Sequence, residues 1–434
     1  MTPAEIVPIL LQTLVQAASI ILLLSGAVAV WVAWKGCRVL RQLARDGTRD
    51  DVNILLKSPR VPAVSVVMVA RDASQRSRAF ARRVLDLYFP HHELVLVLDG
   101  VDADDMDAWT RELRLVPSHR STTGELPASA ATAVYESTDP SPMVVLQKEP
   151  AGEADAWNAG VNAAVSPVIA FFDLETEFAP ESLLRLIRPM LYEPDLMFAV
   201  CGWMPPPPAS GLAGGIADLE TTRLWLGRCA AFAGWKNMLA PVPGSTILVR
   251  RDAIIAASGF SAGPLELFLH LQGRARQSEK PYRAVLVVEL SSFLAAPRTW
   301  SELRQRNMSD QRSISRALRR RKSIMGGRYA LGWGLPAISF QRFWRPLLET
   351  AAYLAAIAGL ALGMVSLQLA LLLLLSAVGA GILVSWSSVV FRELTDFRGS
   401  DPARLRRLFW VAIVENLGYR QLRNLWLIGG YLGR

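Results

Sequence analysis

Long apolar stretches lie near both ends of this 434-residue chain, and short apolar runs separated by polar segments fill the region between them. Ile6 to Trp34 carries no charged residue and is longer than the roughly 20 residues that cross a bilayer. Thr350 to Phe391 is also uncharged, and its length allows two crossings joined by a tight turn near residues 363–368. The pattern therefore predicts a membrane protein whose middle region is exposed to water.

The middle region alternates strand-like and helix-like segments. Runs rich in β-branched and aliphatic residues predict strands at 63–71, 93–98, 143–147, 168–172, 196–203, 245–250 and 284–290. Amphipathic segments predict helices at 74–87, 104–115, 154–164, 217–234, 251–258 and 265–276. The stretch 116–142 is rich in Ser, Thr, Ala and Pro and is predicted to be a surface loop. This alternation predicts an α/β domain with a mostly parallel sheet covered on both faces.

Charge sets the expected orientation. The formal net charge is +9, and 51% of the residues are hydrophobic, which is more than an ordinary soluble enzyme has. Lys35, Arg38, Arg41 and Arg45 follow the first apolar stretch, whereas only Glu5 is charged before it. The positive-inside rule then predicts an N-terminus outside and a cytoplasmic middle region.

A strongly basic segment precedes the second apolar stretch. Arginines crowd residues 304–328, and apolar positions such as Leu303, Ile314 and Leu318 interrupt them. The pattern is typical of amphipathic helices on the cytoplasmic leaflet, and a solvated basic face is the alternative. Because long aromatic–basic interleaving is missing, the basic excess is expected to meet membrane lipids rather than nucleic acid.

Six segments follow from these patterns. They are an N-terminal transmembrane anchor (1–35), a basic linker (36–62), a cytoplasmic α/β domain (63–299), basic interfacial helices (300–345), two transmembrane helices (346–392) and an amphipathic, membrane-associated C-terminal segment (393–434). For the last segment a third span is the alternative, but Glu415, Arg420 and Arg423 would be costly in a bilayer. The three cysteines show no metal-ligand or disulfide spacing and are expected to be reduced.

Two carboxylates follow the most apolar strand of the middle region. Val168 to Phe172 reads as a buried strand, and Asp173 and Glu175 come directly after it. Residues two apart in extended chain point to the same side, so both carboxylates share one face. Hard oxygen ligands at a strand end suit Mg²⁺ or Mn²⁺ holding a diphosphate. The alternative is a solvated strand end before a helix.

Five stretches, taken in order, resemble the membrane-bound family-2 glycosyltransferases, which transfer sugars from nucleotide-sugars into surface polysaccharides. They are VSVVMVARDAS (64–74), VLVLDG (95–100), AGEADAWNAGVNAAVSPVIAFFDLETEF (151–178), PGSTILVRRDAIIAASGF (243–260) and ENLGYRQL (415–422). The resemblance covers nearly the whole chain and implies a GT-A-type nucleotide-binding domain. It also implies a nucleotide-sugar donor, a glycan or lipid acceptor, and polysaccharide-assembly subunits as partners.

The same resemblance assigns roles to individual residues. The implied nucleotide-binding residues are Arg71, Asp72, Asp99, Asn158 and Asp173, and the implied metal ligands are Asp173 and Glu175. Asp99 would accept hydrogen bonds from the ribose or base. For Asn158 two interpretations stand side by side: it positions the strand ends or a phosphate, or it makes only a helix hydrogen bond.

Four departures from the family pattern bear on catalysis. Glu175 stands where the family usually has a second Asp, and Glu153 stands where a Lys commonly faces the diphosphate. Glu266 is the only acid near the expected acceptor base, one helical step beyond it, which makes it the candidate catalytic residue. Processive members of the family carry a Gln-x-x-Arg-Trp motif. Here Gln305 matches its first residue, but the Arg-Trp pair is missing.

Two functions fit these residues. The first is an inverting, metal-assisted glycosyltransferase with altered motifs and Glu266 as general base. The second is a catalytically silent homologue that serves as a binding or scaffold subunit of a polysaccharide-assembly complex. A transporter is disfavoured because three or four spans enclose no evident path.

Overall fold

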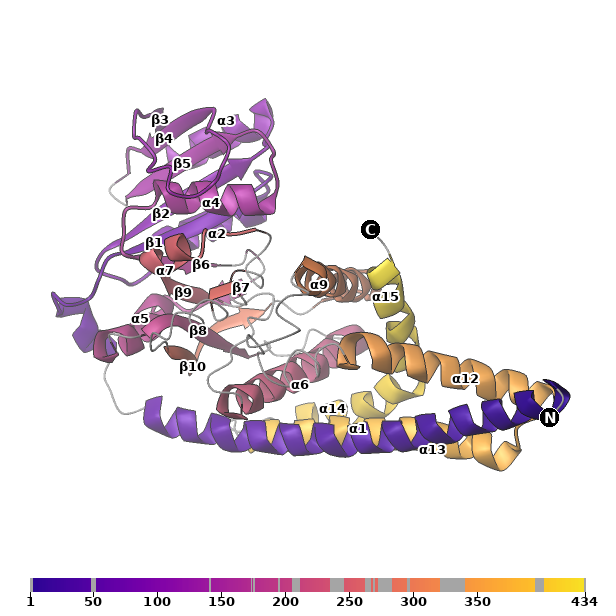
Figure 1. The fold of residues 1–434 in the computed structure, drawn as a ribbon. Helices are drawn as coiled ribbons and strands as arrows, with labels where there is room; N and C mark the ends of the chain where they lie inside the picture. Colours follow the sequence, from indigo (N-terminus) through magenta and orange to yellow (C-terminus); the bar gives the residue numbers. More distant parts are fainter. Residues whose placement is uncertain are drawn as a thin grey trace. The chain divides into compact units, whose positions relative to one another are not determined.

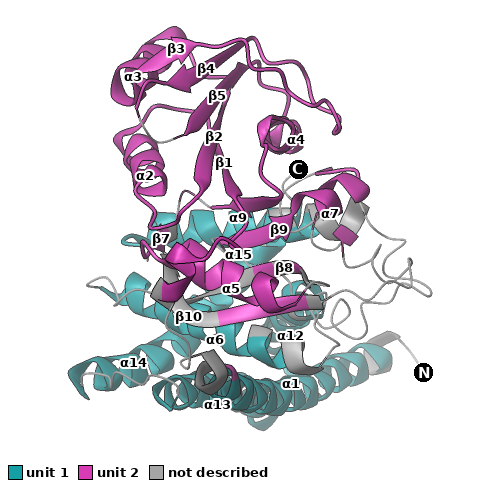
Figure 2. Ribbon diagram, turned by 90° about the vertical axis from the view of Figure 1, so that its left-hand side faces the viewer, with its two compact units in different colours: residues 1–42, 205–235, 296–434 teal, residues 43–204, 236–295 magenta. Residues whose placement is uncertain are grey.

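Figure 1 shows the chain as a computed structural model. The structure describes residues 3–47, 52–139, 142–172, 174, 176–193, 196–204, 211–234, 246–261, 267, 270–271, 283–294, 297–320, 340–394 and 402–432. The chain forms two compact units (Figure 2). We call residues 43–204 and 236–295 the sheet unit, and residues 1–42, 205–235 and 296–434 the helical unit.

The sheet unit is built on one mixed sheet with the strand order β3-β4-β5-β2-β1-β6-β9-β8-β10-β7. Its strands are β1 Val64–Ala70, β2 His92–Asp99, β3 Leu115–Pro117, β4 Ala133–Ser137, β5 Met143–Lys148, β6 Val168–Phe171, β7 Thr176–Phe178, β8 Leu196–Met204, β9 Ile247–Arg250 and β10 Arg283–Leu294. The centre β5-β2-β1-β6 is parallel, and β8 pairs in parallel with β10. Antiparallel pairing joins β9 to β6 and β8, and brings β4, β3 and β7 to the sheet.

Helices cover both faces of the parallel centre. They are α2 Gln75–Leu85, α3 Ala103–Leu113, α4 Glu153–Ala163, α5 Ser182–Tyr192 and α7 Arg251–Ala256, and a short 3₁₀ helix, η1, spans Val52–Lys57. Alternate residues of β2 explain the two-sided cover, since Leu96 joins a core with Phe80 of α2 and Trp109 of α3. Val97 points to the other face, where Gly160 of α4 approaches it. The predicted α/β class with helices on both faces is confirmed.

The stretch 116–142 was expected to be a loop, and this expectation is wrong in part. It contains most of β3 and all of β4, which extend the sheet beyond β5 by antiparallel pairing. Arg114, in left-handed conformation with φ of 51°, ends α3 and turns the chain into β3. Both strands are short and β4 is only half-buried, so neither has the apolar run that marks a central strand.

The helical unit contains the two ends of the chain. Its helices are α1 Pro3–Gly47, α6 Leu212–Gly234, α9 Trp300–Arg320, α12 Arg345–Ala361, α13 Leu367–Glu393, α14 Pro402–Val414 and α15 Arg420–Leu432, with π-helical turns η2 Phe340–Trp344 and η3 Glu415–Tyr419. The last residues of α1 belong to the sheet unit. The helix runs through the expected end of the anchor, so the first part of the predicted linker is helical.

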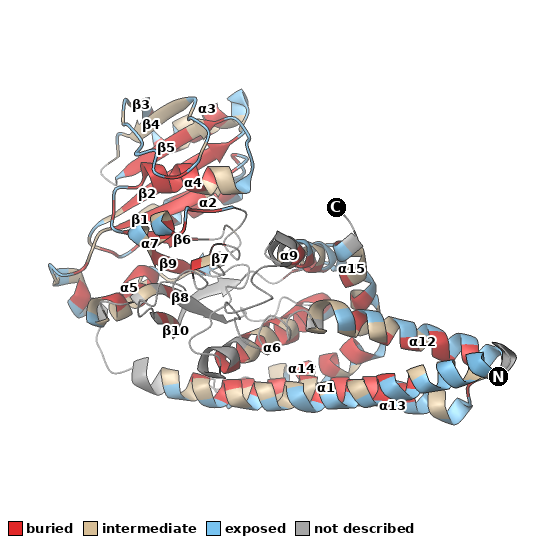
Figure 3. Cartoon of the chain, in the orientation of Figure 1, coloured by how far each residue is buried: buried red, intermediate tan, exposed pale blue. Residues whose placement is uncertain are grey.

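Among the described residues, two helical segments are long and apolar enough to cross a membrane, Ile6–Leu43 and Leu367–Glu393. The predicted turn between α12 and α13 lies at residues 362–366, where Gly363 has a φ of 69°. Many residues of these helices are exposed (Figure 3). The exposed large apolar side chains include Leu24 at 62% and Leu375 at 71% exposure. This outward apolar surface differs from the buried helix of a soluble core.

Small residues let these helices approach closely. A Cβ on Gly36 of α1 would clash with the main chain of Leu226 in α6, and one on Gly26 would lie 2.9 Å from Ala380 Cβ of α13. Close backbone approach through Gly and Ala is typical of helices that pack within a bilayer.

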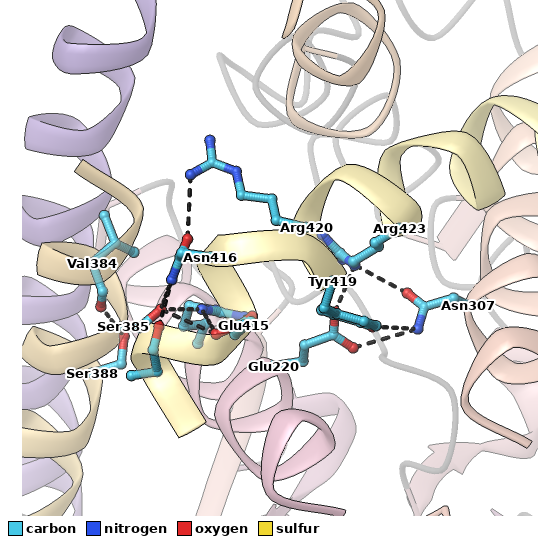
Figure 4. Close-up of polar contacts among 12 residues, drawn as sticks. Glu220, Asn307, Val384, Ser385, Ser388, Glu415, Asn416, Tyr419, Arg420 and Arg423 are labelled. Carbon is cyan, nitrogen blue, oxygen red and sulfur yellow. Dashed lines mark hydrogen bonds and ion pairs between the residues drawn. The ribbon is translucent and has the colours of Figure 1, made fainter. Parts of the chain in front are cut away.

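The C-terminal segment turns its charges into the helical unit. Arg420 forms an ion pair with Glu349 at 3.0 Å, and Arg423 forms one with Glu220 at 2.6 Å. Glu415 accepts hydrogen bonds from Arg223 and from Ser385 (Figure 4). The groups that argued against a bilayer location are therefore paired inside the protein, which lowers the cost of burying them.

Candidate functional site

Four parallel strands end at one edge of the sheet unit. The register of the sheet places Asp99, the last residue of β2, opposite Lys148, the last residue of β5. Arg71 follows β1, and Phe172 follows β6. Because the carboxyl ends of parallel strands bind ligands in open α/β sheets, this edge is the candidate site.

Asp99 is the most unusual side chain at this edge. It is 4% exposed, its Oδ2 lies 3.3 Å from Nε of Arg71, and its Oδ1 is buried without a hydrogen-bond partner within the described part of the chain. A buried carboxylate oxygen that lacks a partner is costly unless something else satisfies it. The side chain of Arg71 is 62% exposed and is therefore free to shift.

Asp72 is used by the turn into α2. Its Oδ1 accepts hydrogen bonds from Ser77 Oγ at 2.7 Å and from the Ser74 amide at 3.1 Å, and these bonds lower the pKa of the carboxyl. Its main-chain oxygen accepts a hydrogen bond from Trp109 Nε1 at 3.2 Å. Asp72 thus fixes the chain that follows β1, next to Arg71.

Asn158 makes no hydrogen bond within its own helix among those described. Its Nδ2 donates to the main-chain oxygens of Pro127 at 2.9 Å and Phe260 at 3.1 Å, and its Oδ1 accepts from the Phe260 amide at 2.8 Å. A Cβ on Gly259, whose φ is 70°, would clash with this Oδ1. Of the two interpretations from the sequence, these contacts give Asn158 a positioning role, since both amide hydrogens are engaged with main chain.

Two further polar residues on the same face of α4 bind the segment before β4. Asn162 accepts a hydrogen bond from the Leu126 amide at 2.9 Å and donates to the Leu126 carbonyl at 2.8 Å. Asp155 accepts from the Ser129 amide at 2.7 Å. The sequence analysis did not assign these roles, although polar residues at positions 155, 158 and 162 recur at helical spacing and so share a face.

Lys148, at the end of β5, is engaged by neighbouring side chains. Its side chain is fully buried, forms an ion pair with Asp155, and donates a hydrogen bond to Ser129 Oγ at 2.8 Å. Burial raises the pKa of Asp155, but hydrogen bonds from Lys148 and Ser129 outweigh it and lower that pKa overall. Glu153, the first residue of α4, is exposed.

Three expected site residues, Asp173, Glu175 and Glu266, lie outside the described residues, and their roles stay predictions. Within the described part of the chain, no group of three or more His, Cys, Asp or Glu side chains is arranged to hold a metal ion. The strand that leads to Asp173 is well fixed, because all residues of β6 are buried and β6 pairs with β1 and β9.

Aromatic side chains surround the end of β6. Phe171 packs edge-on against Trp157 and Phe260, with ring centroids 5.4 and 5.2 Å apart, and Trp157 stacks on Phe260 at 5.8 Å. Since Phe260 is also bound by Asn158, α4, β6 and the turn after α7 form one rigid support at this edge.

The fold of the chain is similar to that of a solved glycosyltransferase with a GT-A-type domain. A mannosyltransferase from Pyrobaculum calidifontis, PcManGT, solved in complex with GDP-Man and Mn²⁺, matches with a TM-score of 0.59 at 16% identity, over 93% of this chain and 99% of that one. Glucosyl-3-phosphoglycerate synthase from Mycobacterium tuberculosis, solved with Mn²⁺, UDP-glucose and phosphoglyceric acid, matches with a TM-score of 0.39 at 13% identity, over 63% of this chain and 84% of that one. No protein-family model and no curated protein matches the chain.

Proposed function

We propose that this protein is a membrane-bound glycosyltransferase that transfers a sugar from a nucleotide-sugar to a glycan or lipid acceptor. The observation that carries the proposal is Asp99, a buried carboxylate at the carboxyl edge of a GT-A-type sheet, one of whose oxygens has no hydrogen-bond partner among the described residues. A ribose hydroxyl or a base N–H would satisfy that oxygen after a shift of the exposed Arg71. The similarity to a mannosyltransferase over both units supports the same class.

The diphosphate is expected to bind through Mg²⁺ or Mn²⁺ held by Asp173 and Glu175. Two hard carboxylates directly after the fully buried β6 fit the ligand preference of these ions. A bound ion would stabilise the charge that develops on the leaving diphosphate. Around it, Asp99 orients the nucleoside, while Asn158 and Asp72 hold the flanking chain in place.

Inverting transfer needs a general base beside the acceptor hydroxyl. Glu266 is our candidate for this role. The outward apolar surface of α1 and α13 supports a location in a bacterial inner membrane, with the sheet unit in the cytoplasm by the charge rule. In this proposal the protein takes part in the assembly of a surface polysaccharide, and other subunits of the assembly machinery are its partners.

A catalytically silent homologue is the second candidate, and the geometry around α4 favours it. Glu153 places an exposed carboxylate at the start of α4, where it would repel a diphosphate. Lys148 cannot compensate, because its ammonium group is buried and paired with Asp155. For this reason we expect slow or undetectable transfer from the isolated chain, even where a donor binds.

Single-turnover assays distinguish the two candidates. Purified protein would be incubated with a labelled donor, Mn²⁺ and lipid extract, and the released nucleoside diphosphate measured for wild type, Glu266→Gln and Asp107→Asn. If the protein is an enzyme, Glu266→Gln should abolish release of the nucleoside diphosphate and Asp107→Asn should retain it. Asp107 serves as the control because it is an exposed residue of α3. A silent subunit binds donor and shows no release that depends on Glu266.

A further inference from the structure

A second polar site lies within the helical unit. A small pocket there is lined by α6, α9, η2 and α15. Its charged and amide-bearing lining residues are Glu220, Arg306, Asn307, Asp310, Arg342 and Arg423. Three arginines face two carboxylates, so the pocket carries an excess of positive charge.

Part of this lining is satisfied internally. Arg423 Nε lies 2.6 Å from Glu220 and donates to Asn307 Oδ1 at 3.1 Å. Tyr419 OH donates to Glu220 at 3.0 Å (Figure 4). Glu220, Asn307, Tyr419 and Arg423 therefore form one hydrogen-bonded group in which the charges of Glu220 and Arg423 cancel.

The other two arginines, Arg306 and Arg342, make no comparably short contact with a carboxylate in the described part of the chain, although the charge of Arg306 acts on Glu220. Across the described residues, neither Arg306 nor Arg342 forms an ion pair with a carboxylate. The chain from 321 to 339, which leads into η2, contains no Asp or Glu that would supply one. Burial, and then the nearby charge of Arg423, lower the pKa of Arg342, and the weaker attraction of Asp310 and Glu220 only partly offsets them. A guanidinium that is desolvated beside another cation is unfavourable without an anion.

We propose that this pocket binds a phosphate group through Arg306 and Arg342. The planar guanidinium fork matches phosphate oxygens in two-point contacts, and Asn307 adds a neutral amide to the lining. Basic pockets between helices at a cytoplasmic membrane surface commonly hold lipid phosphates. The phosphate can belong to a lipid headgroup or be free in solution. The proposal does not rest on transferase activity, because binding needs no sugar donor.

The test is calorimetric titration of the full-length protein in detergent with two probes, inorganic phosphate and dihexanoyl phosphatidic acid. We expect at least one probe to bind, and Arg342→Gln to weaken it by about tenfold or more, as loss of a charge-assisted contact does. Arg304→Gln is the matched control, since Arg304 is exposed on α9 and lies outside the pocket lining, and it should leave affinity unchanged.

The outcomes separate the sources of the phosphate. Binding of phosphatidic acid alone identifies a lipid headgroup, and binding of inorganic phosphate alone identifies a free anion. Gel filtration and thermal unfolding check the fold of each variant, and Arg306→Gln replaces Arg342→Gln if the latter does not fold. Absence of binding for both probes, or equal weakening by Arg304→Gln, would overturn the proposal.

Discussion

Asn158 and Asp99 come from the same sequence resemblance, yet the structure uses them differently. The side-chain amide of Asn158 donates hydrogen bonds to the main-chain oxygens of Pro127 and Phe260. In contrast, one buried oxygen of Asp99 has no hydrogen-bond partner in the described part of the chain. The sequence could place Asp99 at the end of a strand, because strand ends are readable from apolar runs, and it could place Asn158 in the helix that follows β5. It could not tell a positioning residue from a ligand-binding one, since that depends on contacts between residues distant in sequence.

Asn158→Ala should destabilise the sheet unit by about 2–4 kcal/mol, because it leaves buried main-chain groups at Pro127 and Phe260 without partners. Chemical denaturation measures this loss, and Gln75→Ala at an exposed position serves as the control. The folded variant should retain nucleotide affinity. A variant that keeps wild-type stability but loses nucleotide binding would show that Asn158 contacts the ligand instead.

The ion pair between Lys148 and Asp155 should make stability depend on pH. The pKa of Asp155 is lowered in the folded state, so its stabilising effect is present above the ordinary Asp pKa of about 3.9 and is lost as pH falls through the lower folded value. Asp155→Asn should flatten this acid dependence and cost about 3 kcal/mol at neutral pH, because Lys148 is left buried without its partner. Denaturation curves from pH 2 to pH 7 for wild type, Asp155→Asn and the exposed-site variant Asp107→Asn provide the measurement. An Asp155→Asn curve parallel to the wild type would contradict the assignment.

At the scale of elements, long and strongly apolar segments were predicted well and short half-buried ones were not. Strands β1, β2, β5 and β6 and helices α2 to α4 lie close to their predicted ranges, because each buries a continuous or periodic apolar set. Strands β3 and β4 were missed because their pairing comes from the neighbouring β5 rather than from their own composition. The start of α6, at Leu212, was missed because glycines at 214 and 215 read as a loop.

Packing of α4 on the sheet depends on the missing side chain of Gly160. A Cβ there would clash with Val67 and lie 3.2 Å from Val97 Cγ2, so Gly160→Ala should cost about 1–3 kcal/mol through overpacking. Gly227→Ala in α6 is the matched control, because no atom lies within 4 Å of its Cβ position, and it should gain up to about 1 kcal/mol of helix stability. Hydrogen exchange of peptides from α4 and α6 would report the two effects separately. Equal and favourable effects at both sites would mean that α4 does not pack as described.

At the scale of the whole molecule, the two units divide the expected functions. The sheet unit carries the edge where we propose that a nucleotide binds, and the helical unit carries the outward apolar helices together with paired internal charges. The hydropathy pattern predicted apolar segments near both ends of the chain and an α/β domain at 63–299. It did not predict that residues 205–235, taken as part of that domain, group with the helical unit. It could not predict that Glu415, Arg420 and Arg423 are paired inside the protein, because their partners come from distant helices.

The expected topology places the sheet unit in the cytoplasm. A cysteine introduced at Ser121, an exposed position between β3 and β4, should react with an impermeant thiol reagent only after the cells are opened. A cysteine introduced at residue 4, before the first apolar stretch, should react in intact cells. Labelling of Ser121→Cys from outside intact cells would reverse the orientation.

Metal-dependent binding of a nucleotide-sugar is the most direct measurement of the proposed function. The purified full-length protein would be titrated calorimetrically with GDP-mannose and UDP-glucose, with Mn²⁺ and with a chelator, and the same titrations repeated for Asp173→Asn and the control Asp107→Asn. We expect at least one donor to bind in the presence of Mn²⁺, and Asp173→Asn or the chelator to weaken it by about tenfold or more while Asp107→Asn has no effect. Failure of both donors to bind, or equal affinity in wild type and Asp173→Asn, would contradict a metal-assisted glycosyltransferase site in this protein.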